Sequence, residues 1–284
     1  MASAPTTRST ENYVRANGLD VHYVERGDGP PLILLNNGMV SVNTIWNGHP
    51  AAYNTYLDKF AERFRVIAPD IRGSGKTVHP GGPIPYELLA DDTLALIDAL
   101  GLERPAICGF SDGGILASIV AITSPASVGA VVNHAGHDLL NPRAPSMAMA
   151  KQIFGGAPDA TDANQDHIAR MAEQSSEMRA MFDLMAGDHD AAQGEGHWQR
   201  VIAQTFPRIT QHCGYTFQDL ARISAPAMIL VGDRDAFCSV EEGVTAYRAL
   251  QAGELAVLPN TGHLITPGAV ETAIEFLDRQ APST

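Results

Sequence analysis

The feature that most constrains the fold of this chain is a short apolar segment that passes through one tight turn into a helical segment. Residues 105–110, PAICGF, form the uninterrupted apolar run expected of a strand buried on both faces. Residues 112–125 have the pattern of a buried helix that stops near Pro125. The turn reads Gly109-Phe110-Ser111-Asp112-Gly113-Gly114 and matches G-x-S-x-G. Its glycines allow strand and helix to approach without side-chain clashes.

The same turn has chemical consequences. A serine in so tight a turn has a strained backbone, and its hydroxyl is lifted above the carboxyl edge of the sheet. The helix that follows offers the N–H of Asp112 to a negatively charged oxygen. Alone, G-x-S-x-G is a weak signal, because small residues cluster in many loops. Its strand–turn–helix context makes it a strong one, so we predict that Ser111 is a nucleophile. The alternative is a purely structural glycine-rich turn.

Strand-like and helix-like segments alternate on both sides of this motif. Such alternation predicts βαβ units and a parallel sheet that is covered on both faces. A hairpin around Asn17-Gly18 opens the chain. The predicted strands then lie at 30–38, 65–70, 105–110, 130–136, 227–235 and 254–259, and the predicted helices at 51–64, 86–102, 112–125, 240–250 and 269–280.

The alternation is interrupted in the middle of the chain. From about residue 138 to 215 there are no buried strands, and Met- and Ala-rich helical pieces replace them. We therefore predict a core formed by residues 11–137 and 216–280, with an inserted helical lid at 138–215.

From about Tyr13 to Gln280 the chain resembles the α/β-hydrolase superfamily, and GFSDGG resembles its nucleophile elbow. The resemblance implies an eight-stranded, mostly parallel sheet with helices on both faces and an inserted lid. The segment PDIRGSGKT is similar to the D-x-R-G-x-G-x-S turn of that superfamily, which we interpret as structural. The matching residues are Asp70, Arg72, Gly73 and Gly75.

The resemblance also implies a catalytic triad in the chain order serine, acid, histidine. Asp235, in VGDRDAF after the penultimate strand, is the predicted acid, and Asp233 is its competitor two residues earlier. His263, in PNTGHLI after the last strand, is the predicted base. Ser111 would attack a carbonyl carbon while His263 takes its proton and Asp235 orients the imidazole.

The loop after the third strand departs from the superfamily pattern. Where the family has His-Gly, this chain reads Asn36-Asn37-Gly38-Met39. The loop donates a backbone N–H to the oxyanion, so a different side chain need not destroy the hole. We predict Met39 and Asp112 as the two donors, with Gly38 or Val40 as alternatives to Met39. An asparagine here resembles lactone hydrolases of the enol-lactonase type and some methylesterases.

Other residues are candidates for substrate binding. They are Asn37, Gly38, Trp46, Asp112 and His137. Trp46 either lines the site or packs in the long insert that contains it. Asp112 is either an acid stabilised by the helix N-terminus or a receptor for a cationic group, as in the amino-acid-ester hydrolases that the elbow resembles. In the lid, the spacing of His189 and His197 matches no metal motif, so we predict no metal.

Composition excludes several classes of partner. The net charge of −13 argues against nucleic acid and against anionic membrane surfaces. Three scattered cysteines fit neither a disulfide framework nor a CxxC metal site. With no visible signal peptide and no apolar run of about 18 residues, we expect a cytoplasmic protein. No cofactor motif is present, and a homodimer that uses the lid surface is the assembly to test.

We therefore predict a serine hydrolase that cleaves a small or medium-sized ester or lactone. A C–C bond hydrolase or an amidase is the alternative, because one triad supports several chemistries. Epoxide hydrolases and haloalkane dehalogenases resemble the fold but carry Asp at the position of Ser111, which disfavours both activities. A non-catalytic ligand-binding protein on the same fold is the alternative from a different class.

Overall fold

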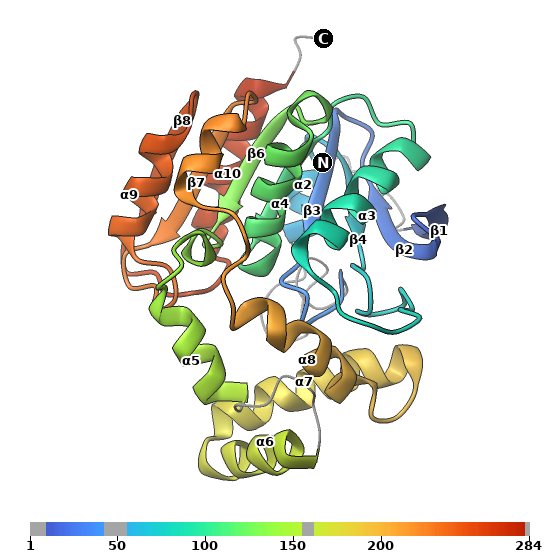
Figure 1. Ribbon diagram of the computed structural model, residues 1–284. Helices are drawn as coiled ribbons and strands as arrows, with labels where there is room; N and C mark the ends of the chain where they lie inside the picture. Colours follow the sequence, from blue (N-terminus) through green and yellow to red (C-terminus); the bar gives the residue numbers. More distant parts are fainter. Residues whose placement is uncertain (1–9, 43–55, 155–161, 282–284) are drawn as a thin grey trace, which may run out of the picture.

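The computed structural model describes residues 10–42, 56–154 and 162–281. Its centre is an eight-stranded sheet in the order β1-β2-β4-β3-β5-β6-β7-β8 (Figure 1). Strand β2 pairs antiparallel with β1 and β4, and the other pairings in this sheet are parallel. The strands span Thr10–Ala16 (β1), Leu19–Arg26 (β2), Pro31–Leu35 (β3), Arg65–Pro69 (β4), Ala106–Phe110 (β5), Ala130–His134 (β6), Ala227–Gly232 (β7) and Gly253–Leu258 (β8). The predicted sheet is thus confirmed.

The hairpin between β1 and β2 forms at the predicted turn. Asn17 and Gly18 both have positive φ, 42° and 76°. Two-residue hairpin loops need this conformation, which Asn and Gly adopt most readily. The turn sets the register from Thr10 opposite Glu25 to Ala16 opposite Leu19.

Helices cover both faces of the sheet. The helices of the core span Tyr56–Ala61 (α2), Tyr86–Ala99 (α3), Asp112–Thr123 (α4), Val240–Ala249 (α9) and Pro267–Gln280 (α10). Alternate residues of β3 face opposite sides. Ile33 and Leu35 pack in one cluster with α3 and α4, whereas Leu32 and Leu34 pack in another with α2 and α10. The central strands are therefore apolar at nearly every position, which explains their uninterrupted apolar sequences.

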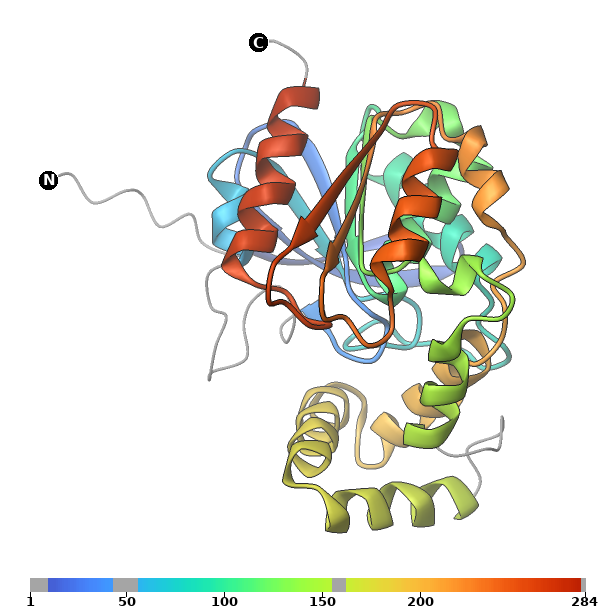
Figure 2. The ribbon, with the colours of Figure 1, turned by 90° about the vertical axis from the view of Figure 1, so that its left-hand side faces the viewer.

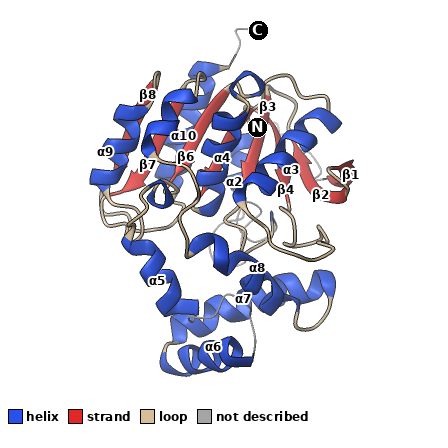
Figure 3. Ribbon diagram, in the orientation of Figure 1, coloured by secondary structure: helices blue, strands red, loops and turns tan. Residues whose placement is uncertain are grey.

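A group of helices without strands lies beyond the carboxyl edge of the sheet (Figures 2 and 3). These helices are α5 (Pro145–Phe154), α6 (Asp162–Gln174), α7 (Ser176–Gln193) and α8 (His197–Ile209). They fall in the range predicted for the lid, and we call them the lid. Three short 3-10 helices complete the described elements, at Pro125–Ser127, Asp138–Leu140 and Phe217–Arg222. No described helix combines the length and the apolar character that crossing a membrane requires.

An apolar cluster joins the lid to the core. Val40 of the loop after β3 packs with four buried lid residues. These four side chains are 1–4% exposed, and they are Phe182, Met185, Ile202 and Phe206. The lid is thus seated on the loop that follows β3.

Two lid histidines, His189 and His197, attach the lid to the core through hydrogen bonds. His189 Nδ1 accepts from the Gly75 N–H at 3.1 Å, and its Nε2 donates to the Met39 carbonyl at 2.8 Å. His197 Nε2 donates to the Gly73 carbonyl at 3.0 Å. Both imidazoles therefore bind backbone atoms of core loops.

Candidate active site

Ser111 lies between β5 and α4, in the predicted turn. Its φ and ψ are 55° and −121°, a conformation that is costly for a residue with a side chain. The Ser111 N–H donates to the His134 carbonyl at 2.8 Å. A Cβ on Gly113 would lie 2.4 Å from the Asn36 carbonyl oxygen, and a Cβ on Gly109 would lie 2.0 Å from that of Gly113. The glycines are needed because the backbones touch.

We expect Gly113→Ala to lower the free energy of unfolding by about 1–3 kcal/mol, because the added methyl group overpacks the junction of α4 with β3. Urea unfolding followed by circular dichroism measures the change. Gly187→Ala is the matched control, since a Cβ there meets nothing within 4 Å. In a helix interior this change should instead be stabilising. Equal stability of the two variants would contradict the steric explanation.

Three predicted residues meet above the carboxyl edge of the sheet. The distance from Ser111 Oγ to His263 Nε2 is 2.9 Å, and that from His263 Nδ1 to Asp235 Oδ2 is also 2.9 Å. A carboxylate can only accept, so Nδ1 carries the proton and Nε2 accepts from the serine hydroxyl. Each residue follows a different strand, β5, β7 or β8. The parallel sheet brings these strand ends to one edge.

Hydrogen bonds in the structure distinguish Asp235 from Asp233 as the partner of His263. Oδ1 of Asp235 accepts from the Phe237 and Cys238 N–H groups at 2.8 and 2.9 Å, which leaves Oδ2 for His263. Burial raises the pKa of Asp235, but the hydrogen bond and charge of His263 and these two N–H groups outweigh it, so the net pKa is lowered. Asp233 is exposed and accepts from Thr261 N–H at 3.1 Å, near the loop that carries His263.

Aromatic rings hold the His263 imidazole in place. The ring centroids of Phe110 and Phe237 lie 5.0 and 4.8 Å from that of His263. Phe110 also packs against His134, at 4.9 Å. Burial, together with the nearby His263, lowers the pKa of His134 to about 3. His134 is therefore neutral in the folded protein.

Acid should destabilise the protein through His134. An unfolded histidine binds a proton below about pH 6.5, whereas folded His134 does not until about pH 3. Its contribution is thus fully present above pH 6.5 and is lost as the pH falls towards 3. The lost stability amounts to about 1.4 kcal/mol per pH unit within that window. Urea unfolding of the protein and of His134→Asn from pH 7 to 4.5 tests this, and parallel curves for the two would contradict it.

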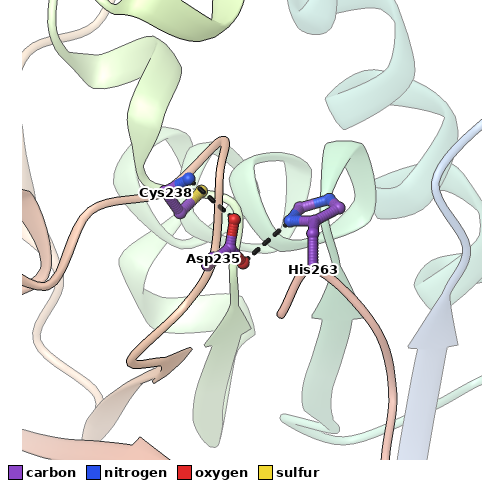
Figure 4. A group of neighbouring side chains, drawn as sticks. All are labelled: Asp235, Cys238 and His263. Atoms are coloured by element: carbon purple, nitrogen blue, oxygen red, sulfur yellow. Dashed lines mark hydrogen bonds and ion pairs between the residues drawn. The ribbon is translucent and has the colours of Figure 1, made fainter. Parts of the chain in front are cut away.

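Asp235 and His263 also form a group with Cys238 that could be mistaken for a metal site (Figure 4). The Cys238 thiol is fully buried and donates to Asp138 Oδ1, with 3.5 Å between sulfur and oxygen. Burial raises the pKa of the Cys238 thiol well above its usual range. The Asp235 carboxylate accepts from the Phe237 and Cys238 N–H groups and pairs with His263, so hydrogen bonds account for the proximity of these residues.

A cavity of about 310 Å³ opens over the serine. Its wall is mainly apolar, and the lid supplies part of it. Polar atoms come from Ser111 and His263, from Asn37, Tyr86 and Asp112, and from Asp138 and Ser146 on the lid side. The lining residues are Asn37, Met39, Tyr86, Ser111, Asp112, Ile115, Asp138, Leu139, Ser146, Ala150, Ile153, Met178, Met181, Ile209, Phe237 and His263.

Asp112 is buried beside the nucleophile, but its charge is already paired. Arg208 of α8 donates from Nη2 to Asp112 Oδ2 at 2.6 Å, and its Nε lies 3.2 Å from both carboxylate oxygens. Tyr86 donates its hydroxyl to Asp112 Oδ1 at 2.5 Å. Burial raises the pKa of Tyr86 well above its usual range, so this hydroxyl stays protonated. This network corrects the hypothesis that Asp112 receives a cationic group, because Arg208 occupies that position.

In the loop after β3, Gly38 and Met39 both use their N–H groups internally. The Gly38 N–H donates to Asn36 Oδ1 at 3.2 Å, and the Met39 N–H donates to Asn37 Oδ1 at 3.1 Å. Gly38 has a φ of 75°, and a Cβ there would lie 2.6 Å from Asp112 Oδ2. The predicted donor Met39 therefore lies at the cavity with its N–H already bonded.

Two further predictions of substrate contact have different outcomes. The prediction for His137 is wrong: its side chain is fully buried, and Nε2 donates to the Ser239 carbonyl at 3.1 Å. A histidine so enclosed supports the turn before α9 and has no contact with the cavity. Trp46 lies outside the described residues.

Three polar cavity residues escaped the sequence analysis, Tyr86, Asp138 and Ser146, and so did Arg208, the partner of Asp112. Arg208 carried a detectable signal, because Val201, Thr205 and Arg208 follow the i, i+4, i+7 spacing and all three are buried. A charged residue on an apolar stripe indicates a buried partner. Asp138 also follows the carboxyl end of a strand, where sites of open α/β sheets form.

Comparisons with known proteins agree with this architecture. The model of the alpha/beta hydrolase family matches residues 32–275. The human serine hydrolase BPHL is 26% identical over 270 residues, a match that covers 92% of this chain and 83% of that protein. The enol-lactonase from Burkholderia xenovorans LB400 superposes with a TM-score of 0.72 at 20% identity, covering 94% of this chain and 99% of the other.

A shorter match links the chain to epoxide hydrolases. The soluble epoxide hydrolase of Corynebacterium sp. (strain C12) is 31% identical over 112 residues, which are 39% of this chain and 36% of that enzyme. The chain thus spans only about a third of the length of that relative. The family match, by contrast, runs from β3 into α10 and includes all three residues of the Ser111–His263–Asp235 arrangement. The chain therefore belongs to the alpha/beta hydrolase family.

Proposed function

We propose that this protein is a serine hydrolase that cleaves a small or medium-sized carboxylic ester or lactone through an acyl-enzyme on Ser111. The observation that carries the proposal is the continuous hydrogen-bond chain from Ser111 Oγ through His263 to Asp235, with 2.9 Å at both links. This chain opens into a cavity of about 310 Å³. A merely structural serine would need neither an oriented base nor a cavity.

The reaction follows from this geometry. As Ser111 Oγ attacks the carbonyl carbon, its proton passes to His263 Nε2, and the carbonyl oxygen becomes an oxyanion. Asp235 stabilises the resulting imidazolium. His263 then returns the proton to the leaving alkoxide, and an acyl-enzyme remains on Ser111. Water, deprotonated by His263, cleaves the acyl-enzyme and releases the acid. With a lactone, the alcohol stays attached and the product is a hydroxy acid.

The cavity favours a neutral substrate. Its wall is mainly apolar, and Met178 and Met181 can adapt to different shapes. The one arginine that reaches this region, among the described residues, is neutralised by Asp112. An anionic substrate would thus find no free cation, and the net charge of −13 would repel it. Asp112 is likewise unavailable to an amine, so amino-acid esters should have no advantage over neutral esters of equal size.

A substrate panel tests the proposal. We expect the purified protein to turn over p-nitrophenyl esters or lactones, and a fluorophosphonate to label it at Ser111, as located by peptide mass spectrometry. Labelling without turnover across the panel would favour the C–C bond hydrolase or amidase. Neither labelling nor turnover would overturn the enzyme proposal in favour of a ligand-binding protein.

A further inference from the structure

The loop between β3 and residue 42 has few backbone donors left for an oxyanion. Gly38 and Met39 donate to the side chains of Asn36 and Asn37. The Ser41 N–H donates to Asp188 Oδ2 of the lid at 2.5 Å. Further along, the Val42 N–H donates to Asp70 Oδ1 at 2.9 Å. The N–H groups of Met39, the predicted donor, and of Gly38, one of its alternatives, are therefore engaged elsewhere.

The Asn37 side chain carries a hydrogen-bond donor of its own. Its Oδ1 accepts from the Met39 N–H, so the other end of the carboxamide is the NH₂ group, with two protons to donate. Asn37 lines the cavity together with Ser111 and His263. Its neighbour Asn36 differs, because Asn36 is fully buried and its Nδ2 is enclosed without a partner. Of the two asparagines, only Asn37 lines the cavity.

We infer that Asn37 Nδ2 is a donor of the oxyanion hole, acting beside the N–H of Asp112 at the start of α4. This inference rests on the proposed function. Asn37 transfers no proton in this step. The hydrogen bond from its NH₂ group to the substrate carbonyl oxygen strengthens as negative charge develops on that oxygen. Removing one such donor costs roughly 10²- to 10³-fold in kcat. The Asn37 side chain is then a catalytic residue of this chain, although the family pattern has a histidine at this position.

The donor is held in position from the lid. Met39 accepts from His189 Nε2 with its carbonyl, and it donates its own N–H to Asn37. His189 is itself fixed by the Gly75 N–H. A hydrogen-bonded series from α7 through Met39 thus orients the Asn37 carboxamide before substrate arrives. Such fixed donors need no reorganisation during the reaction.

Two variants of Asn37 separate this role from a structural one. Asn37→Ala removes both the donor and the acceptor for Met39. Asn37→Asp keeps the acceptor and removes the donor. We expect both variants to lose roughly 10²-fold or more in kcat with little change in KM. An Asn37→Asp variant close to the native rate would show that the side chain only holds the loop. A faster Asn37→Ala would show that Asn37 blocks the Met39 N–H. Either result would overturn the inference.

Asn36→Ala is the matched control, because it removes the corresponding hydrogen bond to the Gly38 N–H without altering the cavity wall. We expect it to lose less than tenfold in kcat, and a loss as large as that of Asn37→Ala would indicate general distortion of the loop. A trifluoromethyl ketone, whose adduct with Ser111 carries an oxyanion, gives a second readout. Its Ki should rise in Asn37→Ala in proportion to the loss of kcat/KM, which a change in loop stability alone would not produce.

The rate of fluorophosphonate labelling separates this inference from the proposed function. The phosphoryl oxygen of the reagent occupies the same position as the oxyanion, so Asn37→Ala should be labelled roughly 10²-fold more slowly. Absence of labelling in the native protein would overturn the proposed function. Labelling of Asn37→Ala at the native rate would overturn the role of Asn37 and leave the serine hydrolase intact.

Discussion

Ser111→Ala is expected to lose roughly 10⁴-fold or more of the proposed esterase activity, and Asp235→Asn a comparable amount. Without Ser111 there is no atom to form the acyl-enzyme. Without the Asp235 carboxylate, which His263 Nδ1 reaches at 2.9 Å, the imidazole loses its correct tautomer and the stabilisation of its charged form. Steady-state kinetics on the best ester of the panel measures both losses.

Asp233→Asn is the control for Asp235→Asn, because it alters the same turn by the same chemical change. Asp233 is exposed and contacts the N–H of Thr261, not His263. We expect it to retain activity within a few-fold of the native protein. If Asp233→Asn lost as much activity as Asp235→Asn, the assignment of the acid would be wrong. Residual activity of Ser111→Ala near the native rate would remove the nucleophile from the mechanism.

The second large effect concerns stability. Arg208→Met should lower the free energy of unfolding by about 3–5 kcal/mol, because it leaves the carboxylate of Asp112 buried without its cation. The Arg208 and Asp112 side chains are only 2% and 5% exposed. Urea unfolding followed by circular dichroism gives the change. The double variant Asp112→Asn with Arg208→Met should recover much of the loss, since no unpaired charge remains.

Arg15→Met provides a matched control for the loss of an arginine. It breaks the ion pair with Asp20, in which both side chains are more than 60% exposed. Exposed pairs contribute little because water screens them, so we expect a change far smaller than that of Arg208→Met. Equal effects of the two substitutions, or a double variant no better than Arg208→Met, would contradict the importance of the buried pair.

The sequence predicts those parts of the structure that local patterns determine. β5, the turn at Ser111 and α4 follow from one apolar run and three glycines. Asp235 and His263 are identified by the resemblance to the α/β-hydrolase superfamily together with their places after strands. The partners of Asp112 could not be predicted, because Arg208 is 96 residues away in sequence and reaches it only through tertiary packing. His137 was misjudged for a similar reason. Its position near a strand end suggests the cavity, but its side chain turns towards the segment before α9.

The loop after β3 shows a second limit of prediction from the sequence. Sequence spacing indicates which N–H groups lie near Ser111, but it does not reveal which of them are already bonded. The bond from Met39 to Asn37 depends on the local turn geometry, including the positive φ of Gly38. Side-chain hydrogen bonds of Asn to the backbone two residues later are common in turns. That tendency is the signal from which the bonding of the Met39 N–H could have been predicted.

The lid leaves the core after β6 and returns before β7, and these two strands are neighbours in the sheet. The lid is therefore an insertion between two adjacent strands, and it does not alter the order of the other strands in the sheet. The contacts of His189 and His197 with the core are made to backbone atoms of Gly73, Gly75 and Met39, which do not depend on the identity of side chains there. The length and sequence of the inserted segment can therefore differ without changing the order of the strands that carry Ser111, Asp235 and His263.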